Sequence, residues 1–315
     1  MTKADGADFG ALKPGMFDRA ILALTGRMPV SWLGLRLAIL FRRAVTMRLD
    51  YPDGALDVQR WGMRMRLHPR DNGCEKNLLF TPQMYEPLEL DALAAEIALA
   101  NAERRAFVFV DIGANVGLFS LFVAAHAQPD ARILAIEPEP GNLRRLTFNV
   151  AANPTAPVKI VPTALSDAAG DLVIELDRRD RGGSRTRKIS PADAPAGVAR
   201  VVSQTLLGLL AAENIAAVDA LKIDVEGNED VVLGPFFDTA PAALWPRLVV
   251  IEDSRPGWKV DLIAMLLGRG YAVTTRSKQN FVLRRMPASD TEIASAAMAR
   301  NEYRDAASAT LPAKS

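Results

Sequence analysis

The sequence predicts an α/β fold in which a doubly wound, mostly parallel sheet carries helices on both faces. Between residues 101 and 286, apolar strand-like runs alternate with stretches of helical periodicity. One run, 107–111, leads through a glycine-containing turn into an apolar helix, and several runs end in an acid. The chain has 315 residues, 49% of them hydrophobic, which is enough to bury the core of such a fold.

The expected strands are short and rich in β-branched residues, with helical segments between them. The strands are predicted at 107–111, 131–137, 158–162, 220–224, 247–252, 271–275 and 280–285. The helices are predicted at 117–127, 140–152, 228–233 and 258–269. Only residues 277–279 separate the last two strands, which indicates an antiparallel hairpin at the sheet edge. An insertion at 163–204 contains two short strands on either side of a basic loop.

Residues 1–100 are expected to form an N-terminal accessory segment, and residues 287–315 a C-terminal helix and tail. The accessory segment is predicted to contain helices at 16–26 and 31–44, a hairpin of strands 46–54 and 57–68 with a Pro-Asp-Gly turn, a polar loop at 69–80, and a helix from about 86 to 100. Pro87 suits the first turn of that last helix, where a missing N–H costs nothing.

Composition excludes several classes of protein. The formal net charge is +1, so bulk charge gives no indication of a nucleic-acid partner. Cys74 is the only cysteine, which excludes an internal disulfide and a cysteine-based metal cluster and favours a cytoplasmic setting. Arginines interrupt the most apolar early stretch, so no transmembrane segment is expected. Residues 16–44 could lie on a membrane surface, although packing against the main domain is the favoured interpretation.

The turn after the first core strand indicates a nucleotide-like ligand. Asp111 ends the strand, and Gly113 and Gly117 flank the turn that opens the helix. A nicotinamide dinucleotide and S-adenosylmethionine both suit this arrangement, with Glu137 at the end of the next strand binding ribose hydroxyls. Asn115 replaces the middle glycine of the dinucleotide pattern, and Asp111 would repel a pyrophosphate but pair with an ammonium group. These details favour S-adenosylmethionine.

A second group of acids follows the strand 220–224. Asp224, Glu226 and Glu229 lie at its end and in the turn beyond, and Glu252 ends the next predicted strand. The carboxyl ends of parallel strands meet at one edge of a sheet, where ligands bind. The sequence therefore predicts that Asp111, Glu137, Asp224 and Glu252 share a ligand cleft, the alternative being a solvated rim of loops.

Together these motifs resemble the FkbM family of S-adenosylmethionine-dependent methyltransferases. The resemblance covers roughly 85–285 and rests on Asp111-Ile-Gly-Ala-Asn-Val-Gly117, Glu137-Pro138, Asn149 with Asn153, and Lys222-Ile-Asp-Val-Glu-Gly227 followed by Glu229. It implies a class I methyltransferase (Rossmann-like) fold with a seven-stranded sheet whose last strand is antiparallel. It also implies metal-independent O-methylation of a saccharide or secondary metabolite by the core, residues 101–286.

The resemblance assigns cofactor positions residue by residue. It places the methionine part of S-adenosylmethionine at Asp111, Gly113, Asn115 and Gly117, the ribose at Glu137, the adenine at Ser166 and Asp167, and the transferable methyl group beside Asp224 and Glu226, with Glu252 facing the same cleft. Leu207 stands where the family's T-L-D-x-L motif carries an acid, which removes any hydrogen bond that the acid would make.

Transfer to an alcohol needs a base that takes up the hydroxyl proton. Glu226 is the first candidate, followed by Asp224 and Glu252; the alternative is that Glu226 orders its turn or pairs with Lys222, Arg185 or Arg187. His68 is a further candidate base or acceptor contact, whereas His126 is interpreted as a helix-end residue.

Several questions stay open in the sequence. A Mg²⁺ site formed by Asp224, Glu252 and Asp253 is conceivable, although the resemblance argues for no metal. The basic loop 178–188 could bind an anionic acceptor or could simply be solvated. The alternatives to an O-methyltransferase are a nicotinamide-dependent oxidoreductase and a non-catalytic module of the same fold. The sequence does not identify the acceptor or the oligomeric state. Residues 45–90 and 176–200 are expected to form the acceptor pocket.

Overall fold

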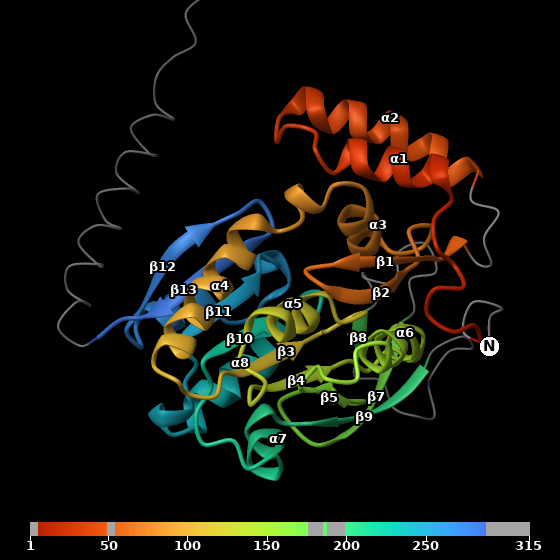
Figure 1. The fold of residues 1–315 in the computed structure, drawn as a ribbon. Coiled ribbons are helices and arrows are strands. Elements are labelled where there is room, and N and C mark those ends of the chain that lie inside the picture. The colour runs from red at the N-terminus through yellow and green to blue at the C-terminus, as the bar shows by residue number, and fades with distance from the viewer. Residues whose placement is uncertain (1–5, 49–53, 176–184, 188–198, 288–315) are drawn as a thin grey trace, which may run out of the picture.

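A seven-stranded sheet in the order β12-β13-β11-β10-β3-β4-β5 forms the centre of the computed structural model, which describes residues 6–48, 54–175, 185–187 and 199–287 (Figure 1). Its strands are β3 (Val108–Ile112), β4 (Arg132–Ile136), β5 (Val158–Val161), β10 (Ala220–Ile223), β11 (Leu248–Glu252), β12 (Tyr271–Arg276) and β13 (Asn280–Arg285). The strands from β11 to β5 pair in parallel, and β13 pairs antiparallel with both β11 and β12. The predicted α/β class and antiparallel last strand are confirmed.

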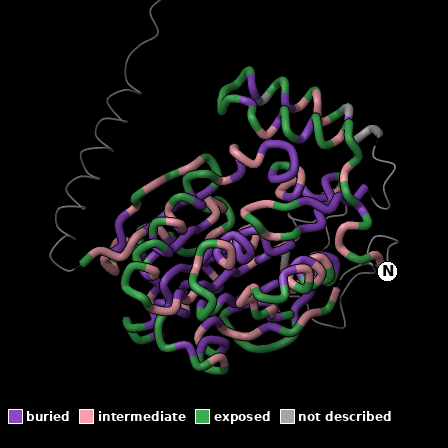
Figure 2. The backbone as a smooth tube through the Cα atoms, in the orientation of Figure 1, coloured by how far each residue is buried: buried purple, intermediate pink, exposed green. Residues whose placement is uncertain are grey.

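Helices cover both faces of this sheet, whereas two others lie farther out. The helices are α1 (Met16–Thr25), α2 (Trp32–Arg48), α3 (Gly73–Phe80), α4 (Pro87–Ala102), α5 (Leu118–His126), α6 (Pro140–Ala151), α7 (Leu206–Ala212), α8 (Glu229–Thr239) and α9 (Leu262–Leu267). Of these, α1 and α2 are the two that lie farther out, beyond α3 (Figure 1). Because strand side chains alternate between faces, Phe109 packs with α4 and α5 on one side, while Val110 packs with α7, α8 and α9 on the other. Two hydrophobic cores therefore sandwich the sheet, and its strands are buried along most of their length (Figure 2).

Two smaller sheets flank the main one. They are the hairpin of β1 (Leu56–Arg60) and β2 (Met63–Leu67), and the sheet of β6 (Ala164–Leu165), β7 (Gly170–Glu175), β8 (Arg185–Arg187) and β9 (Ala199–Gln204). The hairpin shares the hydrophobic core of α4 and α5. Asn149 of α6 and Asn153, just after this helix, bind the hairpin backbone, since their side-chain oxygens accept from the N–H groups of Arg66 (2.7 Å) and Arg64 (2.9 Å).

The accessory segment differs from its prediction in two places. Residues 46–48 belong to α2, and the hairpin turns instead at Trp61-Gly62, where both residues have positive φ (51° and 80°) as a two-residue hairpin loop requires. The predicted polar loop contains helix α3, because the Asn72 side chain caps it by accepting from the Glu75 N–H (3.1 Å). Asn72 followed three residues later by Glu75 is a sequence signal for that helix start.

Helix lengths in the core also differ from expectation. Helix α8 continues past the predicted end at 233, with Pro235 inside it, because Phe236 and Phe237 still pack into the core. Helix α7 was not predicted; Thr205 caps it by accepting from the Gly208 N–H (3.0 Å). The predicted helix 258–269 is reduced to α9. Residues 288–315, most of the predicted tail, lie outside the described residues, and within the described residues no helix has the length and hydrophobicity needed to cross a bilayer.

Candidate active site

The turn between β3 and α5 joins three strand ends. Gly113 has a φ of +76°, and a Cβ atom there would overlap the carbonyl oxygen of Asp224, so only glycine allows β10 to come this close. The N–H groups of Gly113 and Ala114 donate to the carbonyl of Ile136 at 3.0 and 2.9 Å. The turn is thus held against the carboxyl ends of β4 and β10, as the predicted ligand cleft requires.

Asp111 lies fully buried beneath this turn. Its Oδ2 atom accepts hydrogen bonds from the backbone N–H (3.1 Å) and the hydroxyl (2.6 Å) of Ser120. Its Oδ1 atom is buried and has no hydrogen-bond partner among the described residues. Burial raises the pKa of this carboxyl, although the positive charge of Lys222 opposes the shift. An unsatisfied buried carboxylate oxygen is costly, and the ammonium group of a methionine moiety would satisfy it.

Glu137 lies buried at the end of β4, beside the same turn. Its two carboxylate oxygens accept from the backbone N–H groups of Asn115 (2.7 Å) and Glu139 (2.8 Å). Burial raises its pKa to about 8 despite these two donors. Because each carboxylate oxygen can accept more than one hydrogen bond, the fixed carboxylate can still bind the two hydroxyls of a ribose.

Ser166 and Asp167 follow β6, close in the chain to the end of β5. The Ser166 N–H donates to the carbonyl of Gln204 (3.0 Å), and its hydroxyl donates to the Asp167 carboxylate (3.0 Å). Ser166 is buried, whereas Asp167 is exposed. The two residues predicted to contact the adenine therefore lie at the end of the strand pair β6–β9.

Three carboxylates gather at the ends of β10 and β11. Asp224, Glu226 and Glu252 each offer an oxygen atom within 4.8 Å of the other two, and all three side chains are half-buried. Lys222 Nζ lies 3.1 Å from the Asp224 carboxylate. Burial, followed by the negative charges of Asp224 and Glu226, raises the pKa of Glu252 to about 8, while the Ser254 hydroxyl donates to it at 2.9 Å. We call Asp224, Glu226 and Glu252 the acid cluster.

The turn that carries Glu226 is held by another acid. The Glu229 carboxylate accepts from the N–H groups of Val225 (3.0 Å) and Gly227 (3.2 Å) and from the indole N–H of Trp258 (2.6 Å). Glu226 has the left-handed φ of +56°, a costly conformation for a residue with a Cβ atom. The structure thus assigns the ordering of the turn to Glu229, and the strained backbone presents Glu226 to the cluster.

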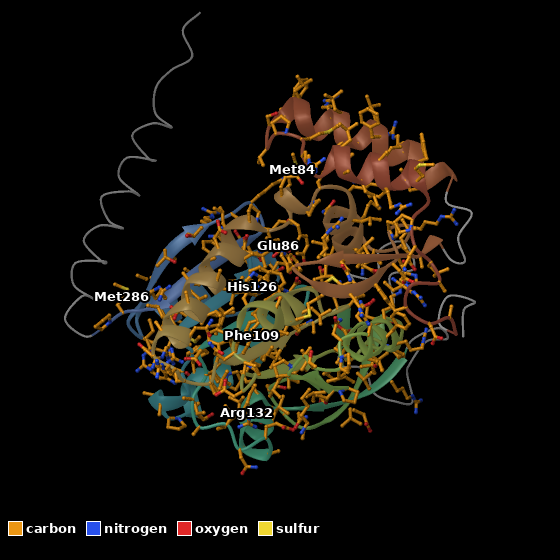
Figure 3. The ribbon with its side chains drawn as sticks, in the orientation of Figure 1. Met84, Glu86, Phe109, His126, Arg132 and Met286 are labelled. Atoms are coloured by element: carbon orange, nitrogen blue, oxygen red, sulfur yellow. The ribbon has the colours of Figure 1, made fainter. Side chains whose placement is uncertain are left out.

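Two functional candidates escaped the sequence analysis, namely Tyr85 and Glu86. Glu86 precedes α4 with a φ of +42° (Figure 3). Burial raises its pKa to about 7, with Lys222 lowering it and Asp224 raising it further. The buried Tyr85 ring packs 6.2 Å from the Phe119 ring. The only sequence signal was Pro87, which marks Glu86 as the residue before a helix start but not as a neighbour of the cluster.

His68 lies in a separate network. It is buried, and its backbone N–H donates to Glu75 (2.5 Å), whose other oxygen accepts from Arg145 (2.8 Å). The Asn72 side chain links this segment to the turn between β3 and α5 by donating to Asn115 (2.8 Å). The described contacts thus bring His68 near the helix α3 cap rather than into the acid cluster, and its role stays a prediction.

The possible metal ligands also differ from the set considered in the sequence. Asp253 binds Arg255 (2.6 Å) and Arg276 (3.4 Å), whereas Glu226 joins Asp224 and Glu252 at the spacing of an ion site. Carboxylate oxygens suit Mg²⁺, but three acids without further ligands do not define octahedral coordination. Metal independence therefore stays a prediction.

Comparison with known proteins provides a family match. The model of the Methyltransferase FkbM domain matches residues 111–273, just over half of the chain. Methyltransferase sdnD of Sordaria araneosa is 31% identical over 204 residues, which span 56% of this chain and 77% of that protein. The 31-O-demethyl-FK506 methyltransferase FkbM of Streptomyces tacrolimicus is 28% identical over 204 residues, 55% of this chain and 76% of that protein.

Solved structures resemble the chain more distantly. The METTL16 methyltransferase domain superposes with a TM-score of 0.44 at 13% identity, covering 86% of this chain and 92% of that chain.

Proposed function

Because this chain belongs to the FkbM family of methyltransferases, we propose that it transfers the methyl group of S-adenosylmethionine to a hydroxyl of a saccharide or secondary metabolite. The observation that carries the proposal is the division of one sheet edge into two parts. Asp111 and Glu137 are buried and fixed beside the glycine turn, whereas the acid cluster is half-exposed at the neighbouring strand ends.

The residues of the first part suit S-adenosylmethionine in charge and in hydrogen bonding. The buried Oδ1 atom of Asp111 can accept from the methionine ammonium group, and Glu137 can accept from the ribose hydroxyls. A dinucleotide fits less well, since its pyrophosphate would lie against Asp111. When bound, S-adenosylmethionine supplies a methyl group already activated by its sulfonium charge.

The residues of the second part suit proton removal. As the acceptor oxygen forms a bond to the methyl carbon and the carbon–sulfur bond breaks, the hydroxyl proton must pass to a base. Glu226 is the proposed base because its strained backbone presents it in the cluster. Lys222 holds Asp224 by an ion pair, and Glu86, whose pKa of about 7 lies near neutrality, is a second group able to exchange a proton.

The class of acceptor rests on the relatives. One relative is a 31-O-demethyl-FK506 methyltransferase, and its O-demethyl acceptor supports O-methylation of a hydroxyl by this chain as well. Half-exposed carboxylates suit a polyhydroxylated acceptor, because each can accept hydrogen bonds from its hydroxyls. A saccharide and a hydroxylated secondary metabolite share this chemistry.

The test combines binding and turnover. Calorimetric titration should show binding of S-adenosylmethionine and S-adenosylhomocysteine and none of NAD. Incubation with S-adenosylmethionine and a panel of sugars and hydroxylated metabolites should add one methyl group to a hydroxyl, read by mass spectrometry, with and without a chelator. Binding of NAD alone would overturn the cofactor assignment, and a product methylated at nitrogen or carbon would overturn the reaction class.

A further inference from the structure

Helices α1 and α2 carry an unusual share of the exposed apolar surface. Eight of the twelve exposed large hydrophobic side chains in the described residues lie between Met16 and Leu40. They are Met16, Phe17, Leu24, Val30, Trp32, Leu33, Leu37 and Leu40. Single exposed apolar side chains are ordinary, but a concentration of them on one unit marks an interaction surface. We call this set the apolar patch.

The opposite sides of the same helices are anchored to the molecule. Ile21 and Leu22 of α1 belong to the core that the hairpin and α4 share, and Ala38 and Val45 of α2 are buried. Leu33, Leu37 and Leu40 follow helical spacing along the other side of α2. The two helices lie side by side at the outer end of the molecule, with many of their residues exposed (Figures 1 and 2). The exposed side is therefore presented outward by a fixed support.

Positive charge accompanies the patch. From Met16 to Arg43 the chain has five arginines and a single acid, Asp18, although the whole chain has a net charge of only +1. Arg19, Arg27 and Arg36 are exposed and make no ion pair with any described residue. The Arg36 guanidinium lies 4.8 Å from the centre of the Trp32 ring, so an aromatic and a cation share one exposed site.

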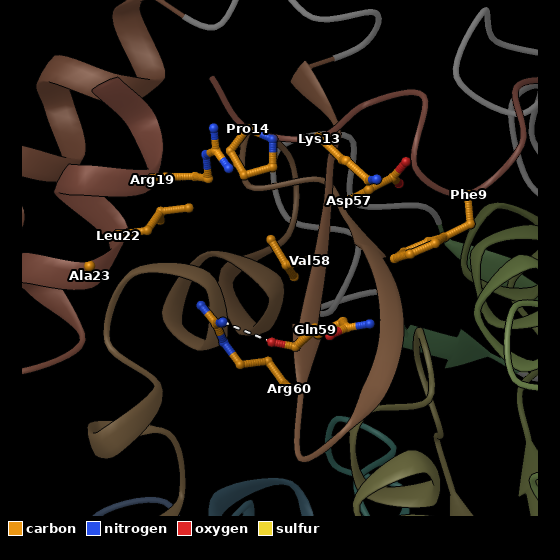
Figure 4. A pocket seen from close by; sticks show the side chains of 10 residues that line it. All are labelled: Phe9, Lys13, Pro14, Arg19, Leu22, Ala23, Asp57, Val58, Gln59 and Arg60. Carbon is orange, nitrogen blue, oxygen red and sulfur yellow. Dashed lines mark hydrogen bonds between the residues drawn. The ribbon is translucent and has the colours of Figure 1, made fainter. Parts of the chain in front are cut away.

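A cavity beneath α1 extends this positive region. It has a volume of about 630 Å³ and lies between Arg19 and Leu22 of α1 and residues 57–60 of β1, with Lys13 at its rim (Figure 4). Its one acid, Asp57, is already paired with Arg66 at 2.7 Å. Lys13 and Arg19 have no such acidic partner among the described residues. The cavity therefore adds unneutralised positive charge between α1 and β1, next to the apolar patch.

We propose that the α1–α2 unit docks the protein on an anionic lipid surface. Apolar side chains, a tryptophan and arginines on one helical unit match the acyl boundary and the negative headgroups of such a surface. A second copy of this chain would bring the same arginines together, which repulsion between like charges opposes. The unit would lie on the bilayer rather than cross it, in keeping with the absence of a spanning helix among the described residues. This goes beyond the proposed methyl transfer and does not depend on it.

The test uses the full-length protein and vesicles of phosphatidylcholine, alone or mixed with phosphatidylglycerol. The protein should sediment with the mixed vesicles at low salt, and much less with phosphatidylcholine alone or at about 0.5 M salt, where charges are screened within a few ångströms. The double variant Leu33→Ser/Leu37→Ser should bind at least about ten-fold more weakly, since both substitutions remove apolar surface that would enter the acyl boundary of the bilayer. Arg19→Gln/Arg27→Gln should abolish the preference for the anionic vesicles.

The matched control is Leu99→Ser/Val260→Ser, which removes two comparably exposed apolar side chains elsewhere. It should bind vesicles as the unaltered protein does, and circular dichroism should confirm that all variants are folded. Equal binding by patch and control variants would overturn the proposal. So would a dimer of the unaltered protein that ignores vesicles and that Leu33→Ser/Leu37→Ser dissociates, because the patch would then hold a second copy.

Discussion

The two parts of the sheet's carboxyl edge treat their acids in opposite ways. Around Asp111 and Glu137, backbone and hydroxyl donors hold three of the four carboxylate oxygens, and the side chains are buried. In the acid cluster, Glu252 has a hydroxyl donor, Asp224 has Lys222, and neighbouring negative charges add to the pKa shift of Glu252. The comparison suggests that the first part is preorganised for one constant ligand, and the second for an exchangeable acceptor and its proton.

The variant with the largest expected effect changes only the acid cluster. Glu226→Gln keeps the shape of the side chain but removes its basicity, so turnover should fall by about 10² to 10⁴-fold, the usual contribution of a general base. Binding of S-adenosylmethionine, measured by calorimetry, should change little. Asp253→Asn is the matched control, because Asp253 is held by Arg255 and Arg276 outside the cluster. Equal losses in the two variants would show that charge at this edge, rather than a base, supports turnover.

The variant with the next largest expected effect changes only the part of the edge around Asp111 and Glu137. Asp111→Asn keeps an oxygen for the Ser120 donors but turns an NH₂ group toward the site of the unpaired Oδ1 atom. Losing a charge-assisted hydrogen bond should weaken S-adenosylmethionine binding by about 10- to 100-fold, measured by calorimetry. Thermal unfolding should show an intact fold. Unchanged affinity would mean that the buried oxygen does not face the cofactor.

These two parts also show what sequence can and cannot supply. Gly113, Asn115 and Glu137 can be predicted as site residues from sequence because local backbone geometry and strand ends leave a signal in short motifs. Tyr85 and Glu86 were missed because only tertiary packing brings the end of the accessory segment within electrostatic reach of the strand-end charges, Asp111 and Asp224 for Tyr85 and Lys222 and Asp224 for Glu86. Helix α3 was misassigned as a loop because its polar first turn concealed a capped start. Glu229 stands out in the sequence as one of the acids after the strand 220–224, but only the structure shows that its carboxylate accepts the hydrogen bonds that order the turn.

A smaller effect tests the electrostatics of the second part. The pKa of Glu252, raised from 4.5 to about 8, means that the folded protein binds an extra proton between these values. The stabilising contribution is therefore complete below about pH 4.5 and is lost as pH rises to about 8. Glu252→Gln should remove this loss and be more stable than the unaltered protein at pH 8.5 by about 1 to 2 kcal/mol, a figure reduced for partial exposure. Urea unfolding at pH 5 and 8.5 measures it.

Asp253→Asn again serves as the control for this titration. Arg255 lowers the pKa of Asp253, so its stabilising contribution is present above pH 3.8 and is lost only as pH falls below that value. The control should therefore show no gain in stability at pH 8.5. A Glu252→Gln variant that gains nothing there would mean that Glu252 is ionised without penalty, and that the negative charges gathered in the acid cluster do not destabilise the folded protein.

The smallest effect concerns Leu207, where the chain departs from its family. Leu207 lies in the first turn of α7 and packs partly against the core of α7, α8 and α9. Leu207→Asp would lose some apolar burial, at a cost of about 1 kcal/mol, but would place a negative charge at the helix N-terminus, worth about 0.3 to 1 kcal/mol. The two effects nearly cancel, so the free energy of unfolding, measured in urea, should change by less than about 1 kcal/mol. Calorimetry should show unchanged S-adenosylmethionine affinity. The carbonyl of Gln204, just before α7, accepts from the Ser166 N–H, so tighter binding would instead extend the proposed cofactor site to α7.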